Sequence, residues 1–400
     1  MTEIKKVILI LFLIFWPNSL FAKQLSKFPF IPDEIYNEFN SLPKNHKIRT
    51  CGFENFNPKW KVINKNLAKK IEGYNSRMDN WREVKGAYSR NVFRHYSEAV
   101  TYAMVSEDKI LKEKLFDKLF QWAKNGALKD TKICYNRTYQ DILRPGCDRA
   151  WSDPNGQDLA PVKDATVSVE LVLGLNNIYS LFFNDYKIDD ERHKTIKKWF
   201  TDFRKRFPLY NKFYWGNSVG WGFPNIFDKH QKDKSYVGIL KNIITGANRA
   251  ILPDGSLKNR TTRGNRGLWY HNSALGEAFM IMEMAYAAKL KLPKKFEPEL
   301  LKAVDLFHKS MIDNSYITPW AKKAYQGQFD KKNPHHQKFA KKLDFIGFNG
   351  IWFHSFQYRY PNHPTTKFLK ERLTTNARSL RHDGYLGIGV GCIYNALANK

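Results

Sequence analysis

Residues 263–287 read RGNRGLWYHNSALGEAFMIMEMAYA. The stretch opens on a polar cluster of arginine, tyrosine, histidine and asparagine, and an apolar run follows that is long enough for several helical turns. A turn signal, PDGS at residues 253–256, precedes the cluster. Asn272 or Ser273 is expected to cap the helix, because either side chain can accept a hydrogen bond from a free backbone N–H. The stretch predicts a basic loop that leads into a buried helix.

Apolar residues recur at helical spacing in other segments of the chain. The clearest are residues 110–123, 167–181, 239–244, 278–287 and 300–307, and weaker ones are 34–42, 96–105, 193–203 and 366–373. Long connections rich in Pro, Gly, Asn, Asp and Trp separate them, at residues 144–161, 213–228, 253–269 and 334–348. The pattern predicts an all-α fold, an (α/α) toroid or incomplete α/α barrel, in which long loops form a cleft. A superhelix of helix pairs is the alternative.

The N-terminus has the features of a signal peptide. Lys5 and Lys6 precede an apolar run at residues 7–16, and LFA at residues 20–22 offers a cleavage site. The run is too short to span a bilayer as a helix. We therefore expect residues 1–22 to be removed and residues 23–400 to form one exported domain, periplasmic or secreted, with no integral membrane segment. An uncleaved N-terminal anchor is the alternative.

The chain is strongly basic, with a formal net charge of +28. Such a charge attracts anions, and nucleic acid, anionic lipid and acidic polysaccharide are the candidate partners. Export argues against nucleic acid, and the sequence has no Gly-rich nucleotide loop, finger spacing or long basic tail. With 42% hydrophobic and 15% aromatic residues, the chain can also fill a large core.

Four cysteines are present, and an even number in an exported chain favours disulfides. Four cysteines allow three pairings. Cys134 with Cys147 is the local choice, and Cys51 with Cys392 would then tie the two ends of the chain together. The spacing does not resemble a zinc site.

A second polar and aromatic cluster lies at residues 214–225, which read YWGNSVGWGFPN. Its glycines allow close approach of the backbone. Tryptophan and tyrosine faces suit the apolar C–H faces of sugar rings. The cluster predicts either a carbohydrate-binding loop or a tight aromatic turn that packs against the core.

Residues 263–275, RGNRGLWYHNSAL, are similar to the "RGxRALxYHNYAL" segment of bacterial alginate lyases, the poly-mannuronate lyase family. Residues 122–128, WAKNGAL, resemble that family's "WAxxDALL" stretch, and NSVGW at 217–221 falls where the family has "NNHxYW". The order and spacing of these stretches hold from about residue 122 to 287. The resemblance implies an (α/α) toroid that cleaves a uronate polymer by β-elimination.

That reaction removes a weakly acidic proton from C5 of the sugar and expels the oxygen at C4. It needs groups that neutralise the uronate carboxylate, a base at C5 and an acid at the leaving oxygen. The resemblance assigns Tyr270 as acid and base, Arg263 and Asn217 as neutralising groups, and His271 as a helper. The substrate-binding candidates are Arg266, Trp215, Trp221, Tyr214 and Trp269. The chemistry requires no metal or cofactor.

Other functions remain open, because the family has a histidine at the position of Ser218. Its absence favours a non-catalytic protein that binds acidic polysaccharide. A glycoside hydrolase on a similar toroid is another possibility, and it would need two carboxylates across the scissile bond. The available acids are Asp153, Asp158, Asp254 and Glu277. A cationic protein that binds lipopolysaccharide or phospholipid is the third alternative.

Overall fold

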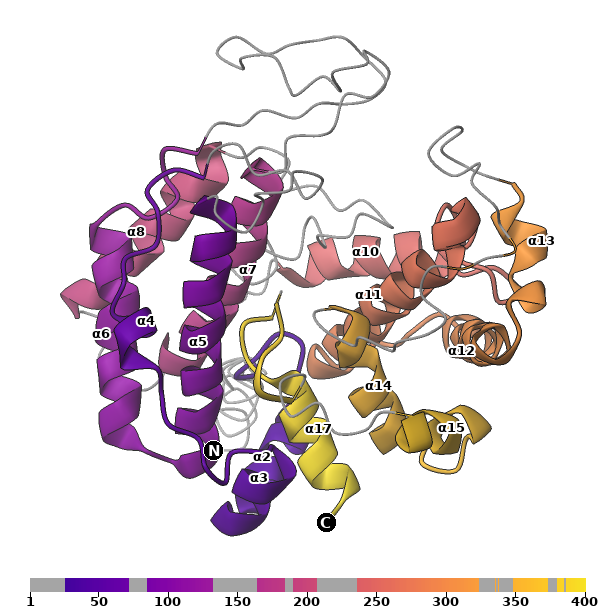
Figure 1. Cartoon of the computed structure of the whole chain (residues 1–400), viewed down its shortest axis with the longest axis horizontal. Coiled ribbons are helices and arrows are strands. Elements are labelled where there is room, and N and C mark those ends of the chain that lie inside the picture. The colour runs from indigo at the N-terminus through magenta and orange to yellow at the C-terminus, as the bar shows by residue number, and fades with distance from the viewer. Residues whose placement is uncertain are drawn as a thin grey trace, which may run out of the picture.

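Helices dominate the fold, and no strand occurs in the part of the chain that the structure covers (Figure 1). The structure is a computed structural model, and it describes residues 26–71, 85–131, 164–183, 190–206, 236–323, 335, 337, 348–372, 380–384 and 386–400. None of the described helices is long and apolar enough to cross a membrane. The all-α prediction is confirmed.

The first half of the chain supplies helices on one side of the molecule (Figure 1). They are α2 (Asp33–Ser41), α3 (Lys44–Thr50), α4 (Trp60–Ile63), α5 (Lys85–Ser106), α6 (Lys109–Lys124), α7 (Asp164–Phe183) and α8 (Glu191–Arg206). The second half supplies α10 (Tyr236–Ala250), η2 (Gly264–Arg266), α11 (Gly267–Ala287), α12 (Phe296–Ile312), η3 (Asn314–Tyr316), α13 (Thr318–Ala321), α14 (Phe348–Arg359), α15 (Pro364–Arg372) and α17 (Val390–Ala398).

Helices α5 and α7 run side by side in the same direction. Arg90 near the start of α5 pairs with Glu170 near the start of α7. One turn further along, Phe93 packs where Gly174 leaves no room for a side chain. Helix α6 returns in the opposite direction, and the Tyr96 hydroxyl of α5 donates to the Leu115 carbonyl at 2.8 Å.

The same pattern recurs in the second half. Helices α11 and α14 run parallel. Trp352 Nε1 of α14 donates to Asn272 Oδ1 of α11 at 2.8 Å, and further along both helices Arg359 pairs with Glu283. Helix α12 is antiparallel to α11. Parallel inner helices joined through antiparallel outer ones are the architecture of an (α/α) toroid.

The burial of each helix follows its sequence pattern. Helix α11 is apolar on nearly all sides, and all but a few of its side chains are buried. Helix α6 is amphipathic: Leu115, Leu119 and Trp122 face the core, and lysines occupy the other face. A helix that is hydrophobic all round belongs inside, and an amphipathic one belongs at the surface.

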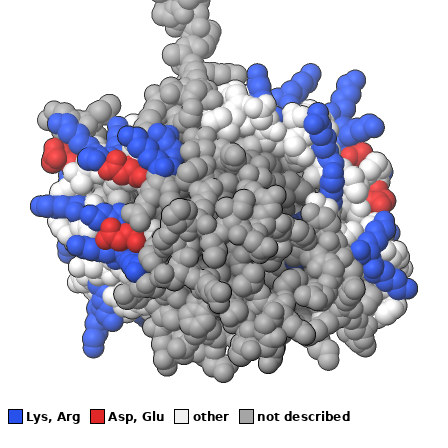
Figure 2. All heavy atoms as spheres, turned by 90° about the horizontal axis from the view of Figure 1, so that it is seen from above, with Lys and Arg blue, Asp and Glu red and all other residues white. Residues whose placement is uncertain are grey.

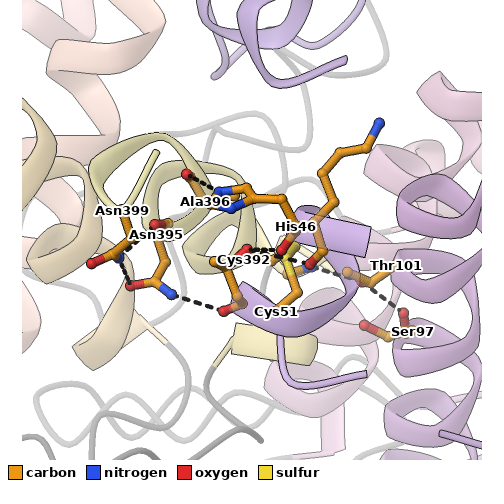
Figure 3. Close-up of a disulfide and its surroundings, with 11 residues drawn as sticks. His46, Cys51, Ser97, Thr101, Cys392, Asn395, Ala396 and Asn399 are labelled. Atoms are coloured by element: carbon orange, nitrogen blue, oxygen red, sulfur yellow. Dashed lines mark hydrogen bonds between the residues drawn. A yellow bond between two sulfur atoms is a disulfide. The ribbon is translucent and has the colours of Figure 1, made fainter. Parts of the chain in front are cut away.

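The two ends of the chain meet where α3 packs against α17, a contact that we call the terminal junction (Figure 3). A disulfide joins Cys51, just after α3, to Cys392 in the first turn of α17, with Cα atoms 4.8 Å apart. His46 contacts the Ala396 carbonyl at 2.9 Å, and Asn395 donates to the Thr50 carbonyl at 2.8 Å. The predicted Cys51–Cys392 bond is confirmed.

The other predicted disulfide, Cys134–Cys147, lies outside the described residues. The terminal junction is further anchored to α5 by Lys47 of α3. The Lys47 side chain is fully buried, and its ammonium donates to Glu107 Oε1 at 2.8 Å. Helix α3 is therefore fastened both to the last helix of the chain and to the end of α5.

Candidate active site

Tyr270 lies in the first turn of α11, and three guanidinium groups surround its ring. The guanidinium carbons of Arg263, Arg260 and Arg266 lie 4.0, 5.2 and 5.5 Å from the ring centroid. Arg260 and Arg263 are buried, whereas Tyr270 and Arg266 are partly exposed. Positive groups this close to an aromatic ring are attracted to its face.

The loop before α11 is shaped by close backbone packing. Residues 251 and 257 form an isolated bridge across the turn that the PDGS sequence predicts. Gly267 begins α11, and a Cβ at this position would lie 2.8 Å from the Thr261 carbonyl oxygen. Only glycine fits such a contact without a shift of the loop. This packing brings the three arginines back over the first turn of the helix.

The expected helix cap is wrong. Helix α11 begins at Gly267, about one turn before Asn272 and Ser273. Gln337 takes the role that a cap would have: its Oε1 accepts from Leu268 N at 2.9 Å, and its Nε2 donates to the Gly264 carbonyl at 3.0 Å. Asn272 is buried inside the helix layer and accepts from Trp352 instead.

His271 lies in the core, with both ring nitrogens in hydrogen bonds. Nε2 contacts the Ala303 carbonyl at 2.9 Å, and Nδ1 contacts the Thr261 hydroxyl at 2.9 Å. Burial lowers the pKa of His271 to about 4, and the bond to Ala303 only partly opposes this effect. The side chain is 0% exposed. A direct contact between His271 and a polysaccharide, as the helper role requires, does not fit this arrangement.

Trp269 offers the site an aromatic surface. Its side chain is 38% exposed, and its ring centroid lies 4.8 Å from that of Tyr270. An exposed indole beside a charged cluster can stack on the apolar face of a sugar while the arginines hold its carboxylate. Of the predicted substrate-binding residues, the structure thus brings Trp269 and Arg266 to Tyr270.

Two of the acids that a hydrolase would need, Asp254 and Glu277, lie in the described part of the chain, and neither is placed as a general acid. Asp254 accepts hydrogen bonds from the Ser256 hydroxyl at 2.7 Å and from Trp320 Nε1 at 3.0 Å. Partial burial raises the pKa of Asp254, but these hydrogen bonds outweigh burial and the net pKa is below its ordinary value. A carboxyl of low pKa is a poor general acid. Glu277 is buried in the middle of α11.

The remaining predicted residues lie outside the described ranges. They are Asn217, Tyr214, Trp215, Trp221 and Ser218, together with Asp153 and Asp158. Within those ranges, no group of three or more His, Cys, Asp or Glu side chains is placed to hold a metal ion.

Two residues contribute to the site although the sequence does not indicate their roles. Thr261 sits inside the basic cluster, where its hydroxyl gave no distinct signal. Gln337 lies 69 residues from Leu268, which it contacts. A polar residue in a connecting loop becomes recognisable as a helix cap only when the fold brings it to the helix.

Comparison with solved structures identifies the fold. No protein-family model matches the sequence, and no curated protein matches it. Several solved structures align over nearly the whole chain, among them three structures of alginate lyases. They are forms of alginate lyase A1-III, and at this level of identity they establish the fold of the present chain.

The alignments are similar in extent. A histidine-to-alanine variant of alginate lyase A1-III complexed with a tetrasaccharide has a TM-score of 0.58 and 14% identity, and covers 94% of this chain and 98% of that one. The enzyme from Sphingomonas species A1 gives 0.56 and 15%, over 89% and 95%. A tyrosine-to-phenylalanine variant with a tetrasaccharide gives 0.57 and 13%, over 93% and 97%.

Proposed function

We propose that this protein is an exported polysaccharide lyase that cleaves an acidic, uronate-containing polymer such as alginate by β-elimination. The observation that carries the proposal is the arrangement of three guanidinium groups around Tyr270 at the start of α11. The alginate lyase fold supports it, and so does the resemblance of residues 263–270 to the Arg-to-Tyr segment of bacterial alginate lyases.

In this mechanism the uronate carboxylate binds to Arg263, assisted by Asn217. A guanidinium can bind a carboxylate through two parallel hydrogen bonds, which stabilises the negative charge that develops when C5 loses its proton. Arg266 and Trp269 hold the neighbouring part of the polymer. Neutralisation comes first, because a free carboxylate would oppose formation of a carbanion beside it.

Tyr270 then serves as base and acid in turn. Its phenolate oxygen takes the proton from C5, and the electron pair of that C–H bond forms the double bond between C5 and C4. The bond from C4 to the glycosidic oxygen breaks, and that oxygen takes the proton back from the Tyr270 hydroxyl. The products are one unsaturated uronate end and one new hydroxyl end, and the phenolate is restored.

Export completes the proposal. The N-terminal residues 1–22 carry the pattern of a cleaved signal peptide, and the Cys51–Cys392 bond suits an oxidising compartment. Basic side chains outnumber acidic ones on the described surface seen in Figure 2. This surface would attract a polyanion in the periplasm or outside the cell.

The experiment is to follow the ultraviolet absorbance of the unsaturated product while the purified protein is mixed with polymannuronate, polyguluronate, glucuronate-containing glycans and sulfated glycans. Tyr270→Phe removes one oxygen and should lower the rate by about 1000-fold, the middle of the range for acid–base catalysis. Tyr286→Phe, at the other end of α11, is the matched control and should leave the rate unchanged.

A binding protein without catalysis is the second candidate, and Ser218 is the observation that favours it. That reading predicts retention of polyuronate with no unsaturated product from any polymer. New reducing ends without a double bond would instead indicate a hydrolase. The three outcomes are distinct, and the lyase proposal fails in either of the last two.

A further inference from the structure

Three separate pieces of the chain meet at the imidazole of His271. The ring belongs to the first turns of α11, Thr261 belongs to the loop before the helix, and Ala303 belongs to α12. All three residues are fully buried. The residue that precedes His271 is Tyr270, and Thr261 is followed two residues later by Arg263. The imidazole therefore joins the segment that carries Tyr270 to the segment that carries the closest arginine.

The hydrogen positions at this contact follow from the partners. The Ala303 carbonyl can only accept, so Nε2 of His271 carries the proton. Since burial keeps the ring neutral, Nδ1 accepts, and the Thr261 hydroxyl is the donor. The same hydroxyl oxygen accepts from Leu257 N at 2.8 Å. One chain of hydrogen bonds thus runs from the turn through Thr261 and His271 to α12.

The Thr261 side chain is fixed by hydrogen bonds on both sides, to Leu257 N and to His271. The Thr261 carbonyl packs against Gly267, so the residue is held through its backbone as well as its hydroxyl. Rotation of Thr261 would shift Arg260 and Arg263 together, because they flank it closely in sequence. Their guanidinium groups lie over the Tyr270 ring, and a displacement there would alter the distance between the carboxylate site and the phenolic oxygen.

We propose that the Thr261–His271 hydrogen bond sets the distance between Arg263 and Tyr270, so that Thr261 and His271 are positioning residues for the elimination. The inference rests on the proposed function for its role in catalysis. It assigns His271 a role in the arrangement of the site in place of a contact with substrate. A displacement of about 1 Å in such a constellation can lower a rate by about 100-fold.

The test compares two threonines with the same hydrogen-bond pattern. The Thr261 hydroxyl accepts from a backbone N–H and donates to His271. The Thr101 hydroxyl of α5, seen in Figure 3, accepts from Gly389 N at 2.9 Å and donates to the Ser97 carbonyl at 3.0 Å. Both side chains are 0% exposed. Thr101→Val is therefore a matched control for Thr261→Val, and Thr261→Ser restores the hydroxyl.

The first readout is the rate on the polymer that the wild-type protein cleaves best. Thr261→Val should lower kcat by about tenfold to 100-fold with a smaller change in KM. Thr261→Ser should recover kcat to within about threefold. Thr101→Val and Thr261→Val should lower Tm by similar amounts, but Thr101→Val should leave kcat unchanged. Equal losses of Tm with unchanged kcat in both valine variants would overturn the proposal, as would a failure of Thr261→Ser to recover the rate.

The second readout needs no activity. In protein with carbon-13 at the tyrosine ζ position, the Tyr270 resonance, assigned by its loss in Tyr270→Phe, should move in Thr261→Val and stay in place in Thr101→Val. An unmoved resonance in Thr261→Val overturns the positioning role. A moved resonance in a protein that cleaves none of the polymers leaves the positioning role in place and removes the proposed function.

Discussion

The start of α11 and the terminal junction are both held by contacts between different segments, yet the segments are separated very differently along the chain. At α11, Thr261 is 10 residues from His271, and His271 is 32 from Ala303. At the terminal junction, the disulfide spans 341 residues, and His46 contacts a residue 350 positions away. Short links restrict local geometry, whereas long ones mainly reduce the freedom of the unfolded chain. We therefore expect the first region to control rate and the second to control stability.

The largest expected effect comes from the disulfide. Cys51→Ala with Cys392→Ala should lower the free energy of unfolding by about 6 kcal/mol, the value that loop-closure entropy gives for a bond across so long a chain. The measurement is urea unfolding, and the rate of the folded protein should not change. A loss of kcat at a temperature where the variant is fully folded would contradict the division between the two regions.

A substitution at Arg263 tests whether the start of α11 controls the rate. Arg263→Lys keeps the charge but loses the planar group that can bind a carboxylate through two bonds. The rate on polyuronate should fall by about 100-fold, with little change in Tm. The control is Arg249→Lys on the exposed face of α10. Similar rates for the two variants would show that charge alone is sufficient at Arg263.

The acid stability of the protein depends on buried histidines. Burial lowers the pKa of His271 and of His354 to about 4, below the ordinary value for histidine, so the unfolded chain binds protons that the folded chain does not. Stability is therefore full above about pH 6.5 and declines as the pH falls toward about 4. Between pH 7 and pH 5, each histidine should remove about 2 kcal/mol.

Urea unfolding at the two pH values measures this decline, and His354→Gln should remove the share of His354 from it. His354 lies on α14 and has no role in the proposed mechanism, so the variant should keep its activity. An equal decline in the variant and the wild-type protein would show that the imidazole of His354 is not held neutral in the folded state.

The smallest effect is expected at Lys47. Removal of one partner from a buried ion pair is usually costly, because it leaves the other charge buried. Here Glu107 is 63% exposed, so water can solvate it when the lysine is lost. Lys47→Met should therefore change the free energy of unfolding by only about 1 kcal/mol. Thermal unfolding measures this change. A loss several times larger would contradict the prediction and would mean that Glu107 becomes buried when the lysine is absent.

The sequence predicted the helices that have one apolar face or a long apolar run. Residues 110–123 and 167–181 fall within α6 and α7, and all nine predicted segments overlap helices. Helices α14 and α17 were not predicted. In helix α14 the polar residues His354, Ser355 and Gln357 are buried together with Trp352, Phe353 and Phe356, so polarity does not mark an exposed face. The spacing of apolar residues alone cannot identify a helix that is buried on every side.

The site was predicted as far as neighbouring sequence could supply it. Arg263, Arg266 and Tyr270 belong to one short segment, and the structure brings them together. The helix start was misplaced because Asn272, a good cap by type, is used to bind Trp352. The burial of His271 could not be foreseen for a related reason. Its partner Ala303 belongs to another helix, and a backbone carbonyl has no signature in the sequence.

The Cys51–Cys392 bond closes residues 51–392 into a covalent ring. A protease that cuts one connection between helices would open this ring without releasing a fragment. The cut protein would keep its mass in a non-reducing gel and separate into two pieces only after reduction. If the protein is exported as proposed, a single cut by an extracellular protease would then leave the two pieces attached to each other.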